Sequence, residues 1–193
     1  MLTLLILAAG ASTRMRGSDK LLEQVAGQPL LARIARAALA TGLPVRVTLP
    51  PDRPARKAAL QGLDVTMIDV PDAASGMAAS LRAGAKGVTG AVMILPADMP
   101  GIDAKIITQM IESHEKSPQF ILRGASGDRA GHPVILPADL VPNLACLQGD
   151  EGARSLLKAH HSRVRLVPLP GTAALIDLDT PEDWAAWRAS GGE

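Results

Sequence analysis

The chain has 193 residues, of which 47% are apolar and only 2% aromatic, and its formal net charge is +1. This length accommodates one α/β domain with a core of its own, and the composition makes that core aliphatic. The near-neutral charge and the scarcity of aromatic side chains argue against nucleic-acid binding, and the single cysteine, Cys146, excludes a disulfide framework or a metal site of several cysteines.

Strands and helices are predicted to alternate along the chain. Residues 2–8 are a continuous apolar run, as in the buried strands of parallel sheets, and residues 29–40 follow as a helix with Pro29 in its first turn. Further strands are expected at residues 45–49, 64–69, 91–95, 119–122, 133–136, 163–167 and 174–178. Further helices are expected at residues 53–61, 76–86, 104–115, 150–160 and 181–188. This alternation predicts a three-layer α/β/α fold with a mostly parallel sheet.

The predicted elements form a single domain over residues 1–189, followed by a short flexible tail at residues 190–193. The opening apolar run is too short for a membrane span and has no basic residues before it, so we expect neither a signal peptide nor a membrane partner. The reducing cytoplasm is the expected location. In sheets of this kind ligands bind beyond the carboxyl ends of the strands, and the motifs below fall there.

The first motif is the loop of small residues at 8–13, which follows the opening strand. Small residues let backbone N–H groups approach a phosphate closely, and Arg14 and Lys20 supply neutralising charge. The spacing fits neither a Walker A loop, nor a dinucleotide-binding fingerprint, nor a nucleophile elbow. The pattern that remains predicts a nucleoside triphosphate site.

Two acidic motifs follow predicted strands. Asp98 comes after the apolar run at 91–95, between two prolines that stiffen the segment. Asp177 and Asp179 would project from one face if residues 174–179 are extended. A carboxylate held at the ligand edge of a sheet suits Mg²⁺, which takes one or two carboxylates together with substrate phosphates. Asp179 or Thr180 could instead serve only as the cap of the following helix.

The predicted helix at residues 76–86 begins with Gly76, and its first N–H groups could face an anion or the edge of a ribose and base. Met77, Ser80 and Gly84 lie on one face of this helix. We expect Met77 to belong to the core and Gly84 to permit close packing.

Two later segments carry a histidine and an arginine. His132 lies between a glycine and a proline, in a loop expected to lead into the strand at 133–136. A lone histidine is more often structural than catalytic. Asp150 is the expected cap of the helix at 150–160, and Arg154 lies on its first turns, where it could pair with an anionic ligand.

These motifs, in this order and from residue 5 to residue 184, resemble those of nucleotidyltransferases, most closely the molybdenum cofactor cytidylyltransferase-like family. The resemblance implies a Rossmann-like, GT-A-like fold. It also implies transfer of a nucleoside monophosphate to a phosphate-bearing acceptor, the molybdenum cofactor, with release of pyrophosphate. The run Leu-Ala-Ala-Gly at residues 7–10 is typical of cytidine users in this family and favours CTP. A molybdenum enzyme that receives the cofactor is the protein partner implied.

The resemblance also implies roles for particular residues. The expected catalytic residues are Arg14, Lys20 and Asp98. The expected Mg²⁺ ligands are Asp98 and Asp179, with Asp177 in reserve. The expected acceptor-binding residues are His132 and Arg154. The expected nucleotide-binding residues are Leu7, Ala8, Ala9, Gly10, Ala11, Ser12, Arg14, Lys20, Ser80 and Asp98.

Two other functions stay open from the sequence. One is a sugar-phosphate nucleotidyltransferase of the same fold, and the other is a non-catalytic protein that delivers the cofactor to a molybdenum enzyme. The presence of Arg14, Lys20, Asp98 and Asp179 together favours a catalytic role over that of a carrier protein. The extra cation Arg16 in the loop and the run Ala-Asp-Met-Pro around Asp98 depart from the family pattern, which leaves the base and the acceptor open.

Overall fold

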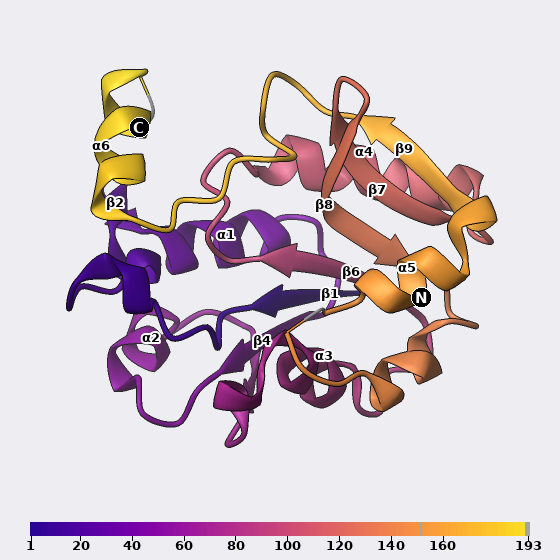
Figure 1. The fold of residues 1–193 in the computed structure, drawn as a ribbon, viewed down its shortest axis with the longest axis horizontal. Coiled ribbons are helices and arrows are strands. Elements are labelled where there is room, and N and C mark those ends of the chain that lie inside the picture. The colour runs from indigo at the N-terminus through magenta and orange to yellow at the C-terminus, as the bar shows by residue number, and fades with distance from the viewer. Residues whose placement is uncertain (151, 192–193) are drawn as a thin grey trace.

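Seven strands form one sheet across the molecule, in the order β5-β4-β1-β6-β8-β7-β9 (Figure 1). The computed structural model describes residues 1–150 and 152–191. The strands are β1 (Leu2–Leu7), β4 (Val45–Leu49), β5 (Thr66–Asp69), β6 (Ala91–Pro96), β7 (Ile121–Ser126), β8 (Arg129–Leu136) and β9 (Val164–Pro168). Only β8 runs against the others, since it pairs antiparallel with both β6 and β7. The predicted mostly parallel sheet is therefore confirmed.

Helices cover both faces of this sheet, as predicted (Figure 1). The helices are α1 (Leu30–Leu39), α2 (Pro54–Ala59), α3 (Met77–Ala85), α4 (Ala104–Lys116), α5 (Arg154–Ala159) and α6 (Pro181–Ala189). Short 3₁₀ turns join them: η1 (Thr13–Met15), η2 (Lys20–Leu22), η3 (Ala73–Ser75), η4 (Val141–Cys146) and η5 (His161–Arg163). A small hairpin of β2 (Gln24–Val25) and β3 (Gln28–Pro29) precedes α1. Within the described residues, no helix is both long and apolar enough to cross a membrane.

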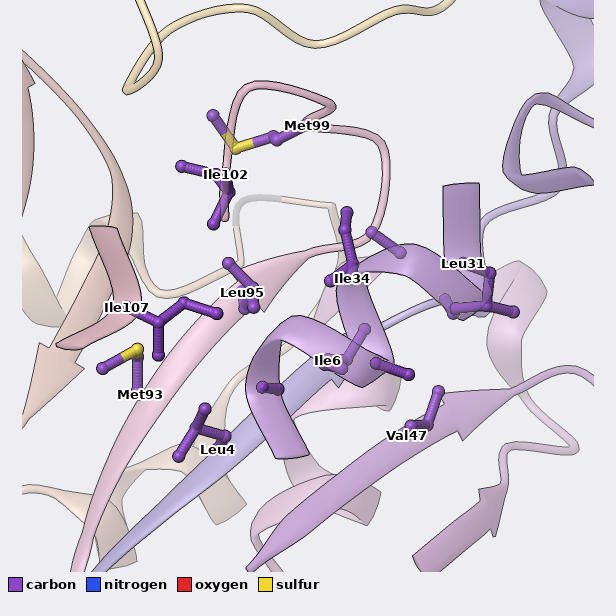
Figure 2. Close-up of a cluster of buried hydrophobic side chains, with 14 of the residues drawn as sticks. Leu4, Ile6, Leu31, Ile34, Val47, Met93, Leu95, Met99, Ile102 and Ile107 are labelled. Atoms are coloured by element: carbon purple, nitrogen blue, oxygen red, sulfur yellow. The ribbon is translucent and has the colours of Figure 1, made fainter. Parts of the chain in front are cut away.

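Alternating side chains of β1 divide the core between the two faces. Leu4 and Ile6 belong to the cluster under α1 and α4, which Figure 2 shows, and Leu5 belongs to the cluster under α3. Burying an aliphatic side chain of this size stabilises the fold by roughly 1.5–3 kcal/mol. Gly84 of α3 sits directly on Leu5, where an added Cβ would collide with the leucine, so its predicted role in close packing is confirmed.

The predicted strand at residues 174–178 is wrong. Residues 171–175 form turns, and residues 176–179 have no regular structure. The N–H groups of Leu175 and Ile176 both donate to the carbonyl of Thr172, so this backbone bonds to itself instead of joining a strand. The segment is held in place by separate backbone bonds, among them Leu178 N–H to the carbonyl of Asp98 (3.1 Å).

Two predicted strands are longer than expected and form a hairpin. β7 and β8 turn at Gly127, which adopts a left-handed backbone (φ 58°). His132 consequently lies within β8 and not in a loop before it.

The helix predicted at residues 150–160 is shorter in the structure, because α5 begins only at Arg154. Residue 151 of the predicted helix lies outside the described residues. Of the expected tail, residues 192–193 also lie outside them, while Ser190 and Gly191 close the last turn of α6 with backbone bonds.

Candidate functional site

A cavity of about 470 Å³ opens beyond the carboxyl ends of β1 and β6, where the sequence places its ligand-binding motifs. The loop after β1, the start of α3, the end of β6 and the segment before α6 all contribute to its lining. The predicted nucleotide-binding residues that line it are Leu7, Ala9, Gly10, Ala11, Ser12, Arg14, Lys20, Ser80 and Asp98. Ala8 does not line it, because this residue is buried and its N–H donates to the carbonyl of Thr48 (3.1 Å).

Two carboxylates and two cations meet in this cavity. The ammonium of Lys20 lies 2.5 Å from an oxygen of Asp98 and 2.6 Å from an oxygen of Asp179. These two oxygens are therefore no more than about 5 Å apart, although the residues are distant in sequence. Arg14 binds the other oxygen of Asp179 at 2.7 Å. The structure thus brings together Arg14, Lys20, Asp98 and Asp179.

The charged groups in the cavity shift one another's pKa values. Burial alone would lower the pKa of Lys20, but Asp98 and Asp179 outweigh it and raise that pKa above its ordinary value. Burial, together with the charges of Asp179 and Asp98, raises the pKa of Asp177. Asp177 lines the cavity, but not from a shared strand face with Asp179 as predicted, because no strand forms there.

The carboxylates have the chemistry of a magnesium site. One oxygen of Asp98, Oδ1, is buried and has no hydrogen-bond partner among the described residues. Within the same residues no group of three or more His, Cys, Asp or Glu side chains could hold a metal ion. Asp98 and Asp179 would supply two ligands, which fits Mg²⁺ because this ion usually takes one or two carboxylates and completes its shell with phosphates and water.

The start of α3 forms another wall. Ser80 lines the cavity and is nearly buried. The N–H of Ala78 donates to the carbonyl of Gly149 (3.1 Å), so the chain itself uses one of the N–H groups expected to face an anion. Met77 is 45% exposed, which contradicts its expected place in the core. Its side chain lies over Gly152, at the border between this cavity and the next.

A second cavity, of about 660 Å³, adjoins the first. Both predicted acceptor-binding residues, His132 and Arg154, line it. Arg123 of β7 and Lys158 of α5 line it too, and no sequence motif predicts a role for either. Asp150 borders both cavities and is not the cap of α5, whose cap position is held by Ala153 without a side-chain bond.

The second cavity is basic. Among the described residues, Asp150 is the only carboxylate in its lining, against Arg123, Arg154 and Lys158. Burial lowers the pKa of Arg123, and the charge of Arg154 lowers it further. Burial first, and then the charge of Arg123, lower the pKa of His132 to about 4 against the opposing effect of Asp98. The imidazole is therefore neutral near pH 7. The cavity suits an anionic ligand because its cations outnumber its one carboxylate among the described residues.

No sequence motif predicts the buried cation that lies behind the first cavity. Arg56 of α2 is fully buried and donates to the carboxylate of Asp19 and to the loop after β1. The hydroxyl of Ser12 accepts from Arg56 (2.9 Å) and donates to Asp19 (3.2 Å). This hydroxyl is thus engaged within the protein and is not available to a ligand in this arrangement.

The chain is similar to known proteins both in sequence and in fold. Residues 4–164 match the family model described as MobA-like NTP transferase domain. A "Molybdenum cofactor guanylyltransferase" of Serratia proteamaculans is 30% identical over 99% of this chain and 96% of its own length. A "Probable molybdenum cofactor guanylyltransferase" of Natronomonas pharaonis is 31% identical over 92% of each chain. The solved structure of Rv0371c from Mycobacterium tuberculosis aligns with a TM-score of 0.78 at 26% identity, and covers 96% of this chain and 95% of that one.

Proposed function

Because the chain belongs to the MobA-like NTP transferase family and is a nucleotidyltransferase, we propose that it transfers CMP from CTP to the phosphate of a molybdenum cofactor-type acceptor, with release of pyrophosphate. The observation that carries this proposal is the meeting of Arg14, Lys20, Asp98 and Asp179 in one cavity beside a second, basic cavity. The first cavity would take the triphosphate, and the second would take the acceptor.

The reaction needs positioning and charge neutralisation more than proton transfer. An oxygen of the acceptor phosphate forms a bond to the α-phosphorus, the bond from that phosphorus to the bridging oxygen breaks, and pyrophosphate takes the electron pair. The nucleophile is already anionic, so no strong base is required. Arg14 and Lys20, on flexible side chains, would turn from the carboxylates to the phosphates and stabilise the charge that develops. Asp98 and Asp179 would hold Mg²⁺, which supplies further positive charge at the phosphates.

The choice of CTP depends on the base side of the first cavity. Ala9 lines this cavity, and its methyl group packs in a small buried cluster with Val70 and Ala79. In the family that this sequence resembles, alanine at this position accompanies cytidine users, which supports CTP. The curated relatives are named guanylyltransferases, which favours GTP. Competition between the two nucleotides decides this: we expect CTP to bind more tightly, and Ala9→Gly to move the preference towards GTP. Tighter binding of GTP by the unaltered protein would overturn the assignment.

The acceptor would lie across the second cavity with its phosphate directed to the first. Arg123, Arg154 and Lys158 supply the positive charge that an anionic acceptor needs, and His132, neutral near pH 7, can offer a hydrogen bond. The names of the curated relatives support the molybdenum cofactor as this acceptor. A molybdenum enzyme would then receive the product.

The experiment that tests the proposal measures pyrophosphate release. The purified protein is incubated with Mg²⁺, each nucleoside triphosphate in turn, and either molybdopterin, a panel of sugar phosphates or no acceptor. We expect release that depends on CTP and molybdopterin. Release with a sugar phosphate alone would indicate a sugar-phosphate nucleotidyltransferase. Binding of the cofactor with no release under any condition would indicate a carrier.

A further inference from the structure

Arg56 holds the nucleotide-binding loop from behind. Its side chain is fully buried, so its charge and its donors must be satisfied within the protein. Nε and Nη2 bind the two oxygens of Asp19 at 2.7 and 2.9 Å. Nη1 donates to the carbonyls of Ala8 (2.6 Å) and Gly10 (2.7 Å), and Nη2 donates to the hydroxyl of Ser12. Every donor of the guanidinium is therefore used on Asp19 or on the loop.

This arrangement fixes which way the loop presents its N–H groups. In a planar trans peptide, a carbonyl and the N–H of the next residue point in opposite directions. Because the carbonyl of Gly10 points at Arg56, the N–H of Ala11 points away from it. Ala11 lines the first cavity, whereas Arg56 does not. Among the described residues, the N–H of Ala11 donates to no protein acceptor, so it is free for a phosphate.

Asp19 connects the same support to the other end of the loop. Its carboxylate also accepts from the N–H of Leu21 (3.1 Å), which caps the short turn that begins at Lys20. Ser12 holds a left-handed backbone (φ 53°), which costs a residue other than glycine about 1 kcal/mol or more, and its hydroxyl bridges Arg56 and Asp19. The buried ion pair of Arg56 and Asp19 thus fixes the backbone of the loop and, through Asp19, the position of Lys20 next to it.

We propose that Arg56 and Asp19 are positioning residues that hold the loop at residues 8–20 in its nucleotide-binding shape before a nucleotide arrives. The inference rests on the proposed function, since it assumes a triphosphate in the first cavity. It assigns a role in binding to two residues that line neither cavity. When the loop is already ordered, less of the binding free energy is spent on ordering it as the nucleotide binds.

The test compares Arg56→Lys with a matched control. Lysine keeps the charge beside Asp19 but cannot reach the aspartate, both carbonyls and Ser12 together. Arg163→Lys is the control, because Arg163 makes a similar set of bonds, to both oxygens of Asp139 and to the carbonyl of Gln119, and none of these three residues lines either cavity. Nucleotide affinity is measured by calorimetry with CTP and GTP. We expect Arg56→Lys to weaken binding by about tenfold or more, as the loss of one or two charge-assisted hydrogen bonds would, and the control to leave it unchanged.

A second readout needs no nucleotide. In hydrogen exchange of the nucleotide-free protein, we expect the amides of Met15 and Leu21, which donate to Ser12 and Asp19 of the loop, to exchange faster in Arg56→Lys. The amides of β1 and β6 should stay protected. Faster exchange throughout the molecule would show a role in general stability and overturn the proposal. Unchanged exchange of the loop amides in Arg56→Lys would also overturn it. If the wild type binds nucleotide, an equal nucleotide affinity of Arg56→Lys would overturn it as well. If the wild type binds no triphosphate, the proposed function fails, and the exchange result still decides whether Arg56 holds the loop.

Discussion

Lys20 is the most tightly engaged cation of the first cavity, since its ammonium touches a carboxylate from each of two distant segments. Without this charge, only Arg14, which binds Asp179, would offset the repulsion between the carboxylates of Asp98 and Asp179. With a triphosphate bound, the same charge would stabilise the transition state and the leaving pyrophosphate. A single side chain would therefore serve the electrostatics of the site both with and without substrate.

We predict that Lys20→Ala lowers turnover by about a hundredfold or more, because it removes a charge used in the transition state. Pyrophosphate release gives the rate, and circular dichroism checks that the variant is folded. Lys57→Ala is the matched control, because Lys57 pairs with Asp69 at 2.7 Å outside both cavities. A folded Lys20→Ala variant with near-normal turnover would remove Lys20 from the mechanism.

His132 makes the stability of the fold depend on pH. The folded protein holds its pKa at about 4, through burial and the nearby charge of Arg123, whereas an unfolded chain takes up the proton near pH 6.5. Between these values the unfolded state binds more protons, so the free energy of unfolding falls as pH drops from 6.5 to 4 and is unaffected by this group above that range. The loss amounts to about 3 kcal/mol at most.

Urea unfolding at pH 7.5 and pH 4.5 measures this effect. We predict that the wild type loses more stability between the two pH values than His132→Gln, which keeps a polar side chain but does not titrate. The other acidic and basic groups are common to both proteins and cancel in the comparison. Equal losses in the two proteins would show that His132 titrates normally in the fold.

At the scale of elements, the hairpin of β7 and β8 brings both Arg123 and His132 to the second cavity. We predict that Arg123→Met raises the KM for the acceptor by about tenfold and leaves nucleotide affinity unchanged, because one cation facing an anionic acceptor is lost. The fold should not suffer, since the change also removes repulsion with Arg154. Steady-state kinetics with varied acceptor measures the effect. Arg129→Met, exposed on the same hairpin, is the control, and equal KM values in the two variants would contradict the role.

The elements that could be predicted from the sequence are those whose signals are local. β1 and β6 are continuous apolar runs, and α6 starts where Thr180 and Asp183 form a capping box, with bonds of 3.1 and 2.9 Å. The segment at 174–178 has a strand-like composition, but its backbone partners, such as Asp98 and His132, come from distant parts of the chain. No local pattern contains that information.

Local patterns are limited in the same way for the residues of the candidate site. The loop and its cations follow one strand and could be recognised together, and the acidic residues stood at predicted strand ends. Arg56 could not be recognised, because the sequence shows only a cation on a short helix, while its burial depends on Asp19, which lies 37 positions earlier. Arg123 was equally hidden, since β7 was predicted to end before it.

At the scale of the whole molecule, the site depends on two segments that the fold holds together. Asp98 follows β6 in the middle of the sheet, and Asp179 precedes α6 near the end of the chain. The backbone bond from Leu178 N–H to the carbonyl of Asp98 fixes the two segments side by side. Both carboxylates are engaged by Lys20, and Asp179 also by Arg14. A metal ion alone must therefore compete with these cations.

We predict that Mg²⁺ or Mn²⁺ binds at least about tenfold more tightly when a triphosphate is present, because the phosphates draw Arg14 and Lys20 from the carboxylates and complete the shell of an ion that loses water reluctantly. Calorimetry measures metal binding with and without a CTP analogue whose α–β bridge is a methylene group. Asp98→Asn should lose activity at ordinary Mg²⁺ and recover part of it at high Mg²⁺ or with Mn²⁺. Asp177→Asn is the comparison: if it abolishes metal binding and Asp179→Asn does not, Asp177 is the second ligand. Equal metal affinity with and without the analogue would refute the coupling between metal and nucleotide.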